Sequence, residues 1–294
     1  MRIKPYDDTI GRFIIVDVWK QMWNHLYPED PVSEGEFSVK LNPRDFLIAE
    51  DKQGSLIGFG GLLESSSSNF WRVMGIVLPE YIESSLPGKI FDAIVNLAKK
   101  KGIRNLRFYS RAQFTQYNMK IKEMGINPLQ YGWFMRLDDF KTLPQSIFPP
   151  EITIQKQESI DDLDAYIAVY NETHRDTFEF EAFTEKRIHK FFNQIRKVFE
   201  IEHYFAFEKK KLIGICYSSI NRKQKLIGTI NALGVLPSYR QRGIGSTLLG
   251  FGIQSLREKG CKAIDLSVMA DNEQALTLYK KFGFYELKSR TQYI

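Results

Sequence analysis

Two arginines and two glycines near residue 243 have the types and the spacing that suit the binding of an anion. They lie in the segment Leu233-Gly234-Val235-Leu236-Pro237-Ser238-Tyr239-Arg240-Gln241-Arg242-Gly243-Ile244-Gly245-Ser246. The segment joins an expected strand to an expected helix that Gly260 ends. A helix N-terminus has unpaired N–H groups and partial positive charge, and glycines let several N–H groups converge. Arg240 and Arg242 add full charges, so the segment predicts a diphosphate site.

A second candidate group lies in the segment from Asp271 to Phe284, which has the pattern of a helix. Asp271 is the expected N-cap of this helix. Asn272 and Tyr279 are seven residues apart, about two helical turns, so both lie on the same side. The two side chains can therefore meet one extended ligand.

Both segments resemble signature motifs of the GNAT superfamily of acetyltransferases. Arg240, Gly243 and Gly245 fill the defining positions of Gln/Arg-x-x-Gly-x-Gly/Ala. The second segment fills every named position of Asn-x-x-Ala-x-x-x-Tyr-x-x-x-Gly-Phe. The glycine spacing differs from the dinucleotide fingerprint, and the Gly-Lys-Ser/Thr of a P-loop is absent. The resemblance implies an acetyl-CoA-dependent N-acetyltransferase that acetylates a primary amine, with its cofactor site in the C-terminal half.

The resemblance also implies a role for each matching residue. Asn272 would meet the pantetheine arm, and backbone groups near Gly234 would pair with the pantetheine amides. Tyr279 would meet the sulfur as general acid, because direct attack by the amine expels a thiolate that a phenol can protonate. The expected cofactor-binding residues are Leu233, Gly234, Val235, Arg240, Gln241, Arg242, Gly243, Ile244, Gly245, Ser246, Asn272 and Tyr279. No metal is expected.

The general base is left open by the sequence. Many relatives have a glutamate on the strand before the loop, but Ile227 to Leu233 contains no carboxylate. Water ordered by Asn231 or Thr229 is one alternative, and a carboxylate from the preceding helices is another. His174 is a third candidate for the base. The expected substrate-side residues are His174, Glu179 and Asn231, although the segment around the first two also fits an ordinary solvated loop.

The elements that must position these residues occur twice in the chain. Val77-Leu78-Pro79 and Val235-Leu236-Pro237 each precede a helix that ends before a glycine, at Gly102 and Gly260. A strand, a helix and a further glycine follow in both halves, at a constant offset of 158 residues. This pattern indicates an internal duplication. We expect an α/β (α+β) fold of two tandem GNAT-like domains, each a mixed, mostly antiparallel sheet flanked by helices.

The two copies are expected to differ in function. The proline-containing segment Phe140 to Pro150 predicts a linker, which gives a first domain at 1–145 and a second, catalytic domain at 146–294. At offset 158, Gly243 and Gly245 correspond to Ser85 and Pro87. The counterparts of Arg240, Asn272 and Tyr279 are Ile82, Phe114 and Ile121. The first domain should therefore not bind acetyl-CoA in the usual way, an arrangement similar to that of mycothiol synthase.

Composition narrows the remaining function classes. The chain has 294 residues and a net charge of +6, but its basic and acidic residues are interleaved, so no nucleic-acid partner is expected. No apolar run is long enough for a membrane span, and no signal peptide is evident. Cys216 and Cys261 lie in apolar segments and are expected to be reduced, which favours a cytoplasmic protein. The four histidines have no metal-ligand spacing.

Several functions fit these observations. The leading one is acetylation of a small-molecule amine, and an enzyme that acetylates proteins or peptides is an alternative. A non-catalytic acyl-CoA-binding module is a third, favoured by the missing strand glutamate. A tRNA-dependent peptide-bridge transferase also pairs two such domains, but it would have little use for an intact CoA loop. The expected oligomeric state is a monomer or a homodimer.

Overall fold

The structure is a computed structural model of residues 1–294. It describes the whole chain except residues 27–41, 65–69, 111–114, 124, 127, 141–142, 145–147, 158, 178–179, 224 and 294. Two compact units are present, one of Met1–Tyr131 with Arg290–Ile294, and one of Gly132–Ser289. The expected boundary between 145 and 146 falls in a stretch outside the described residues.

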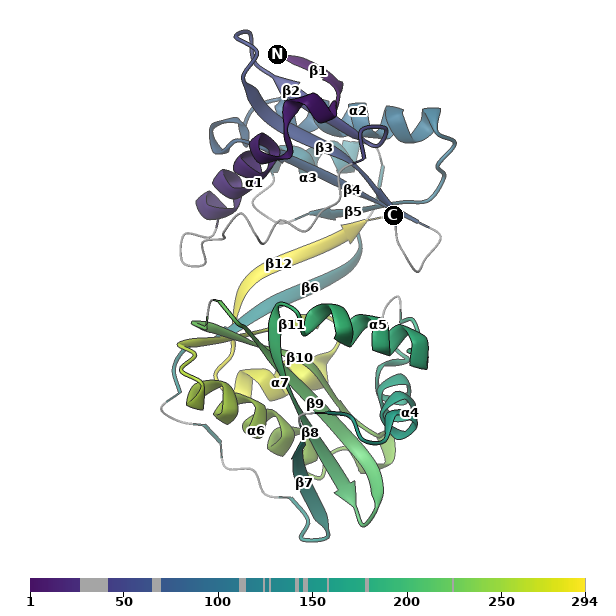
Figure 1. The fold of residues 1–294 in the computed structure, drawn as a ribbon, viewed down its shortest axis with the longest axis vertical. Coiled ribbons are helices and arrows are strands. Elements are labelled where there is room, and N and C mark those ends of the chain that lie inside the picture. The colour runs from purple at the N-terminus through teal and green to yellow at the C-terminus, as the bar shows by residue number, and fades with distance from the viewer. Residues whose placement is uncertain are drawn as a thin grey trace. The chain divides into compact units, whose positions relative to one another are not determined.

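The first unit is a sheet with helices (Figure 1). Its pairing order is β1-β2-β3-β4-β5-β12, antiparallel except for the parallel pair β4–β5. The strands are β1 (Arg2–Pro5), β2 (Phe46–Glu50), β3 (Leu56–Glu64), β4 (Trp71–Val77) and β5 (Leu106–Ser110), with the end of β12 (Tyr285–Tyr293). The helices are α1 (Arg12–Leu26), α2 (Leu86–Lys100) and α3 (Thr115–Glu123), with 3-10 turns η1 (Asp8–Ile10) and η3 (Pro79–Tyr81).

The second unit repeats this plan. Its pairing order is β6-β11-β10-β9-β8-β7, antiparallel except for the parallel pair β10–β11. The strands are β6 (Pro128–Leu137), β7 (Ile152–Gln157), β8 (Phe199–Glu208), β9 (Lys211–Asn221), β10 (Ile227–Val235) and β11 (Ala263–Met269). The helices are α4 (Leu163–His174), α5 (Glu185–Ile195), α6 (Ile244–Glu258) and α7 (Glu273–Lys281), with the 3-10 turn η4 (Pro237–Tyr239). The expected mixed, mostly antiparallel α/β fold is confirmed.

The duplication is visible in the positions of the elements. Helices α2 and α6 begin at Leu86 and Ile244, 158 residues apart, and end at Lys100 and Glu258 with the same offset. Helices α3 and α7 keep this offset at both ends, as do the turns η3 and η4. The constant spacing in the sequence therefore reflects two copies of one structural framework.

Two strands cross from one half of the sequence to the sheet of the other. In the second unit, residues 132–137 of β6 pair with β11, although β6 follows α3 of the first half. In the first unit, residues 291–293 of β12 pair with β5. Each sheet is thus completed by a strand from the opposite half of the chain.

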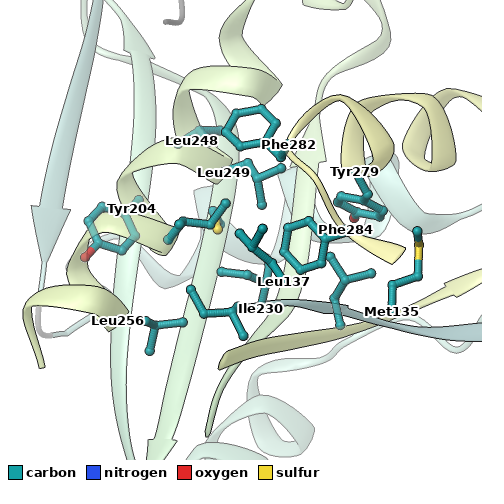
Figure 2. Close-up of a cluster of buried hydrophobic side chains, with 14 of the residues drawn as sticks. Met135, Leu137, Tyr204, Ile230, Leu248, Leu249, Leu256, Tyr279, Phe282 and Phe284 are labelled. Atoms are coloured by element: carbon teal, nitrogen blue, oxygen red, sulfur yellow. The ribbon is translucent and has the colours of Figure 1, made fainter. Parts of the chain in front are cut away.

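The second sheet has apolar side chains on both faces, because helices cover both. Helices α6 and α7 pack over a core that includes Tyr204, Leu248 and Phe282 (Figure 2). Helices α4 and α5 pack over a second, aromatic-rich core that includes Tyr166, Phe192 and Phe205. Strand β9, which lies between these two cores and pairs with β10, is buried along nearly its whole length.

Candidate active site

The loop before α6 has the backbone shape that the sequence pattern predicts for an anion site. Gly243 is the N-cap of α6 with a left-handed φ of 81°, and no side chain caps the helix. Gln241 also has a positive φ, 62°, which is unusual for a residue other than glycine. Alternating left-handed positions before an uncapped helix turn successive N–H groups toward one point. The N-terminus of α6 can therefore hold a phosphate.

Gly245 marks where three elements of the site meet. A methyl group added at Gly245 would lie 3.7 Å from Val235 of β10 and 3.9 Å from Leu278 of α7, which are ordinary contacts. The end of β10, the start of α6 and the middle of α7 are therefore adjacent. Packing within the protein therefore does not require a glycine here.

The two arginines of the loop already have partners. The Arg240 guanidinium donates to the Val235 carbonyl at 3.1 Å. Arg242 pairs with Glu151 at 2.8 Å and lies 3.9 Å from Glu208, with its guanidinium over the Tyr239 ring. The backbone N–H groups are thus the groups of this loop best placed to bind an anion, and the arginines add positive charge around them.

Strand β10 separates from β11 beside the cradle. Their parallel pairing runs from Ile227 to Ile230 and ends there among the described residues. A register shift between Ile230 and Ala232 bulges Asn231 outward, while the β9 side stays paired as far as Val235. The last residues of β10 therefore have peptide groups on their β11 side that an extended ligand can pair with. This is where Leu233, Gly234 and Val235 were expected to bind pantetheine.

The N-cap of helix α7 lies one residue later than expected. Asn272, not Asp271, is the N-cap, and its side-chain oxygen accepts from the Ala275 N–H at 3.1 Å. Both residue types are good caps, so the sequence alone does not separate them. Capping fixes the oxygen of Asn272 and leaves its amide N–H₂ to donate to a ligand.

Tyr279 lies in the interior of the second unit, with 8% of its surface exposed. Figure 2 shows it beside Phe284, whose ring centroid is 5.9 Å away. Burial raises the pKa of the Tyr279 phenol well above its ordinary value. The hydroxyl therefore remains protonated at neutral pH, which is the form that a general acid needs.

On the opposite face of β10, the end of α4 packs directly on Gly234. A side chain at Gly234 would collide with Thr173 at 2.4 Å and would lie 3.2 Å from the His174 ring. His174 Nδ1 is 2.9 Å from the Tyr170 carbonyl, and the two rings stack at 4.3 Å. A carbonyl only accepts, and the Thr173 hydroxyl 2.9 Å away can accept as well, so a proton on Nδ1 satisfies both contacts and leaves Nε2 as the acceptor of the neutral ring.

The surroundings of His174 favour its neutral form. Burial lowers the pKa of His174 and the charge of Arg240 lowers it further, while the hydrogen bond to the Tyr170 carbonyl opposes this. Asn231, also expected on the substrate side, donates to the Ser219 hydroxyl at 2.8 Å. Glu179, the third expected residue, lies outside the described residues. Tyr170 and His174 are four residues apart on one helix. This spacing predicts that their rings stack.

The buried carboxylate of Glu202 does not supply the missing base. Burial raises its pKa, but hydrogen bonds from Lys156, Ser255, Lys259 and Tyr204 outweigh this and lower the pKa to about 2. Lys156 and Lys259 lie 2.7 Å and 2.9 Å from the carboxylate. A carboxylate with so low a pKa binds a proton too weakly to act as a base, so Glu202 holds β8 to α6.

Three further observations bound the site. A cavity of about 490 Å³ lies on the outer side of α6, lined by Phe148, Phe251 and Phe282, and contains none of the expected site residues. In the part of the chain that the structure describes, no His, Cys, Asp and Glu group could hold a metal. Of the described helices, none is long and apolar enough to cross a membrane.

The matching loop of the first unit has a different shape. The N-cap of α2 is Ser85 in a right-handed conformation, followed by Leu86 and Pro87. The Ser84 hydroxyl accepts from the Leu86 N–H at 3.1 Å and donates to the Tyr81 carbonyl at 2.7 Å. One N–H is thus occupied by the chain itself, and Pro87 has none to offer.

Comparison with known proteins finds relatives among acetyltransferases. Residues 164–284 match the acetyltransferase (GNAT) family. The chain is 25% identical over 226 residues to a mycothiol acetyltransferase of Paenarthrobacter aurescens, covering 74% of this chain and 68% of that protein. It is 34% identical over 91 residues to an N-alpha-acetyltransferase of Arabidopsis thaliana, covering 31% of this chain and 48% of that protein.

Solved structures agree in fold along the whole chain. A GCN5-related N-acetyltransferase from Sphaerobacter thermophilus superposes with a TM-score of 0.76 at 18% identity, covering 99% of this chain and 94% of that one. A tandem GNAT protein from the clavulanic acid biosynthesis pathway gives a TM-score of 0.73 at 16% identity, covering 99% and 97%.

Proposed function

The chain is an acetyltransferase with a GNAT domain over residues 164–284, and we propose that it moves the acetyl group of acetyl-CoA to the primary amine of a small molecule. The observation that carries this proposal is the shape of the second unit at Gly243. An uncapped helix N-terminus meets there the end of β10, where the pairing with β11 has already ended among the described residues. Together they suit a ligand with a diphosphate at one end and an amide-containing arm at the other.

Acetyl-CoA supplies an activated thioester, and the residues of the chain do the rest. The loop residues Arg240 to Ser246 hold the phosphates, and the β10 edge with the Asn272 amide aligns the arm. The Tyr279 hydroxyl, which stays protonated at neutral pH, donates a proton to the departing sulfur.

His174 is our candidate for the base that accepts the amine proton. Its ring lies against Gly234 near the end of β10, and strand residues 227 to 233 carry no carboxylate. A neutral imidazole with a fixed tautomer is suited to take up a proton directly or through water. Asn231, at the bulge of the same strand, lies on the substrate side in this proposal.

The first unit, in this proposal, binds no acetyl-CoA and serves as scaffold or partner surface. Isothermal titration calorimetry with CoA tests the whole proposal, and we expect one molecule bound per chain. No heat and no thermal shift at saturating CoA would sink it.

Acetylation of peptides is the second candidate, supported by the N-alpha-acetyltransferase relative. Incubation with radiolabelled acetyl-CoA and two panels, one of small amines and one of peptides, separates the candidates by where the label goes. Label transferred to peptides alone would replace the small-molecule acceptor. Binding of CoA without label transfer to either panel would favour a non-catalytic acyl-CoA-binding module.

A further inference from the structure

A basic turn lies at the same end of the second sheet as the cradle loop. Strand β8 ends at Glu208 and β9 begins at Lys211, with Lys209 and Lys210 between them. Two residues of β9 further on, the Ile213 carbonyl accepts from the Leu236 N–H at 2.9 Å, just where β10 leaves the sheet. The turn and the loop are therefore neighbours.

Tyr239 joins the turn to the loop. Its hydroxyl donates to Glu208 at 2.9 Å. Lys211 lies 5.3 Å from the centre of the Tyr239 ring and Arg242 lies 5.4 Å from it. An aromatic face flanked by two cations is a fixed platform for positive charge. The lysine turn thus has a defined place beside the helix N-terminus.

The balance of charge around this platform is positive. Its five cations are Lys209, Lys210, Lys211, Arg240 and Arg242, and its two anions are Glu151 and Glu208. Both anions contact members of the cluster, through Arg242 and Tyr239. Lys209 and Lys210 are exposed and make no ion pair with the described residues. A net charge of about three positive units therefore faces solvent beside the cradle.

The first unit provides an internal control for this cluster. Its matching turn, Asp51 to Ser55, contains one lysine, and the Asp51 carboxylate accepts from the N–H groups of Gln53 and Ser55 at 2.8 and 2.9 Å. Its matching loop carries Glu80 and Glu83 and no basic residue. The basic turn thus accompanies the phosphate cradle and is lost where the cradle is lost, although the fold is the same.

We propose that Lys209 and Lys210, beside the Tyr239 platform, bind the monoester phosphate on the ribose of CoA. This inference rests on the proposed function. CoA carries a diphosphate and, apart from it, a ribose 3′-phosphate with a charge near two negative units at neutral pH. The backbone N–H groups at Gly243 serve the diphosphate, so the second phosphate requires cations of its own. Lysines act as mobile point charges and suit a terminal phosphate at the protein surface.

Calorimetry with CoA and 3′-dephospho-CoA tests this subsite at a fixed ionic strength. The variant Lys209→Gln/Lys210→Gln removes both charges, and Lys99→Gln/Lys100→Gln, at the exposed end of α2, removes the same number from the first unit. We expect the unaltered protein to bind CoA about five-fold more tightly than dephospho-CoA. The turn variant should lose this preference by binding CoA more weakly with dephospho-CoA unchanged, and the α2 variant should keep it.

Two results would overturn the subsite while leaving the proposed function intact. One is equal affinity of the unaltered protein for the two ligands. The other is equal weakening of both ligands in the turn variant, which would mean that the lysines act only through the general field of the protein. If neither ligand binds the unaltered protein, the proposed function fails and the subsite fails with it.

Discussion

The two loops that precede α2 and α6 occupy the same place in the same framework and have opposite chemistry. Before α6, Gln241 and Gly243 are left-handed and the helix is uncapped. Before α2, Ser84 occupies an N–H group and Pro87 removes another. The elements around both loops keep an offset of 158 residues. In our proposal, anion binding thus depends on a few backbone angles and on glycine, and not on the sheet and helices that carry them.

The largest effect is expected from replacing Tyr279 of α7 by an apolar residue, as at the matching position of α3. Tyr279 corresponds to Ile121, which is completely buried. Tyr279→Phe should lower kcat by about 100-fold, because the general acid is lost, with less than two-fold change in the Kd for CoA. Steady-state kinetics and calorimetry measure the two quantities. Equal turnover by the variant would remove the acid role.

The next largest effect is expected from replacing Gly245, after the loop before α6, by proline, which is the residue at the matching position of the first unit. Gly245→Pro deletes one N–H in the first turn of α6, where proline is tolerated by the helix. The Kd for CoA should rise by about ten- to a hundred-fold, the range for a hydrogen bond to a charged group. Gly245→Ala keeps the N–H and makes only ordinary contacts, so it is the matched control. Unchanged affinity in the proline variant would refute the cradle.

A smaller effect is expected from replacing His174. This residue lies outside the two loops compared above. Burial lowers the pKa of His174, so the base stays neutral until the pH falls below the ordinary value of about 6.5. In the unaltered protein, kcat/KM should fall on the acid side with an apparent pKa below about 6.5. His174→Gln should lower the rate at pH 7.5 by at least about ten-fold and abolish that acid limb. A variant that keeps the same pH profile would exclude His174 as the base.

The smallest effect is expected from the first loop itself. Glu83→Gln removes a negative charge from this loop, yet the Ser84 contact and Pro87 remain. Calorimetry should still give one CoA per chain, with less than two-fold change in Kd. A second binding event would show that charge alone, and not backbone shape, separates the two loops.

Much of the fold follows from the sequence, because glycines and prolines punctuate both copies at equal spacing. The strand–loop–helix order around Gly243 and the helix that carries Tyr279 are predictable in this way. The exchange of β6 and β12 is not, since an apolar strand pattern specifies a buried face and not a neighbour. The packing of His174 on Gly234 is also beyond the sequence, because it depends on where α4 crosses the sheet.

The cap of α7 shows a finer limit of the same kind. Asp271 and Asn272 are adjacent and both are good caps, so local propensity cannot choose between them. The choice of Asn272 sets which atoms of that side chain remain for a ligand. A one-residue shift that hardly changes the fold thus alters the chemistry of the site.

Because each sheet contains a strand from the other half of the chain, the order in which the two halves are synthesised affects folding. A ribosome delivers the first half of the chain long before residues 291–293, yet those residues pair with β5 in the first unit. Until the second half of the chain has been synthesised, β5 lacks this partner strand, and unpaired strand edges are prone to wrong pairing. For the same reason, if the chain were divided within Phe140 to Pro150 and either half expressed alone, its sheet would lack one strand. The first half of the chain thus supplies a strand, β6, to the sheet that carries the proposed site.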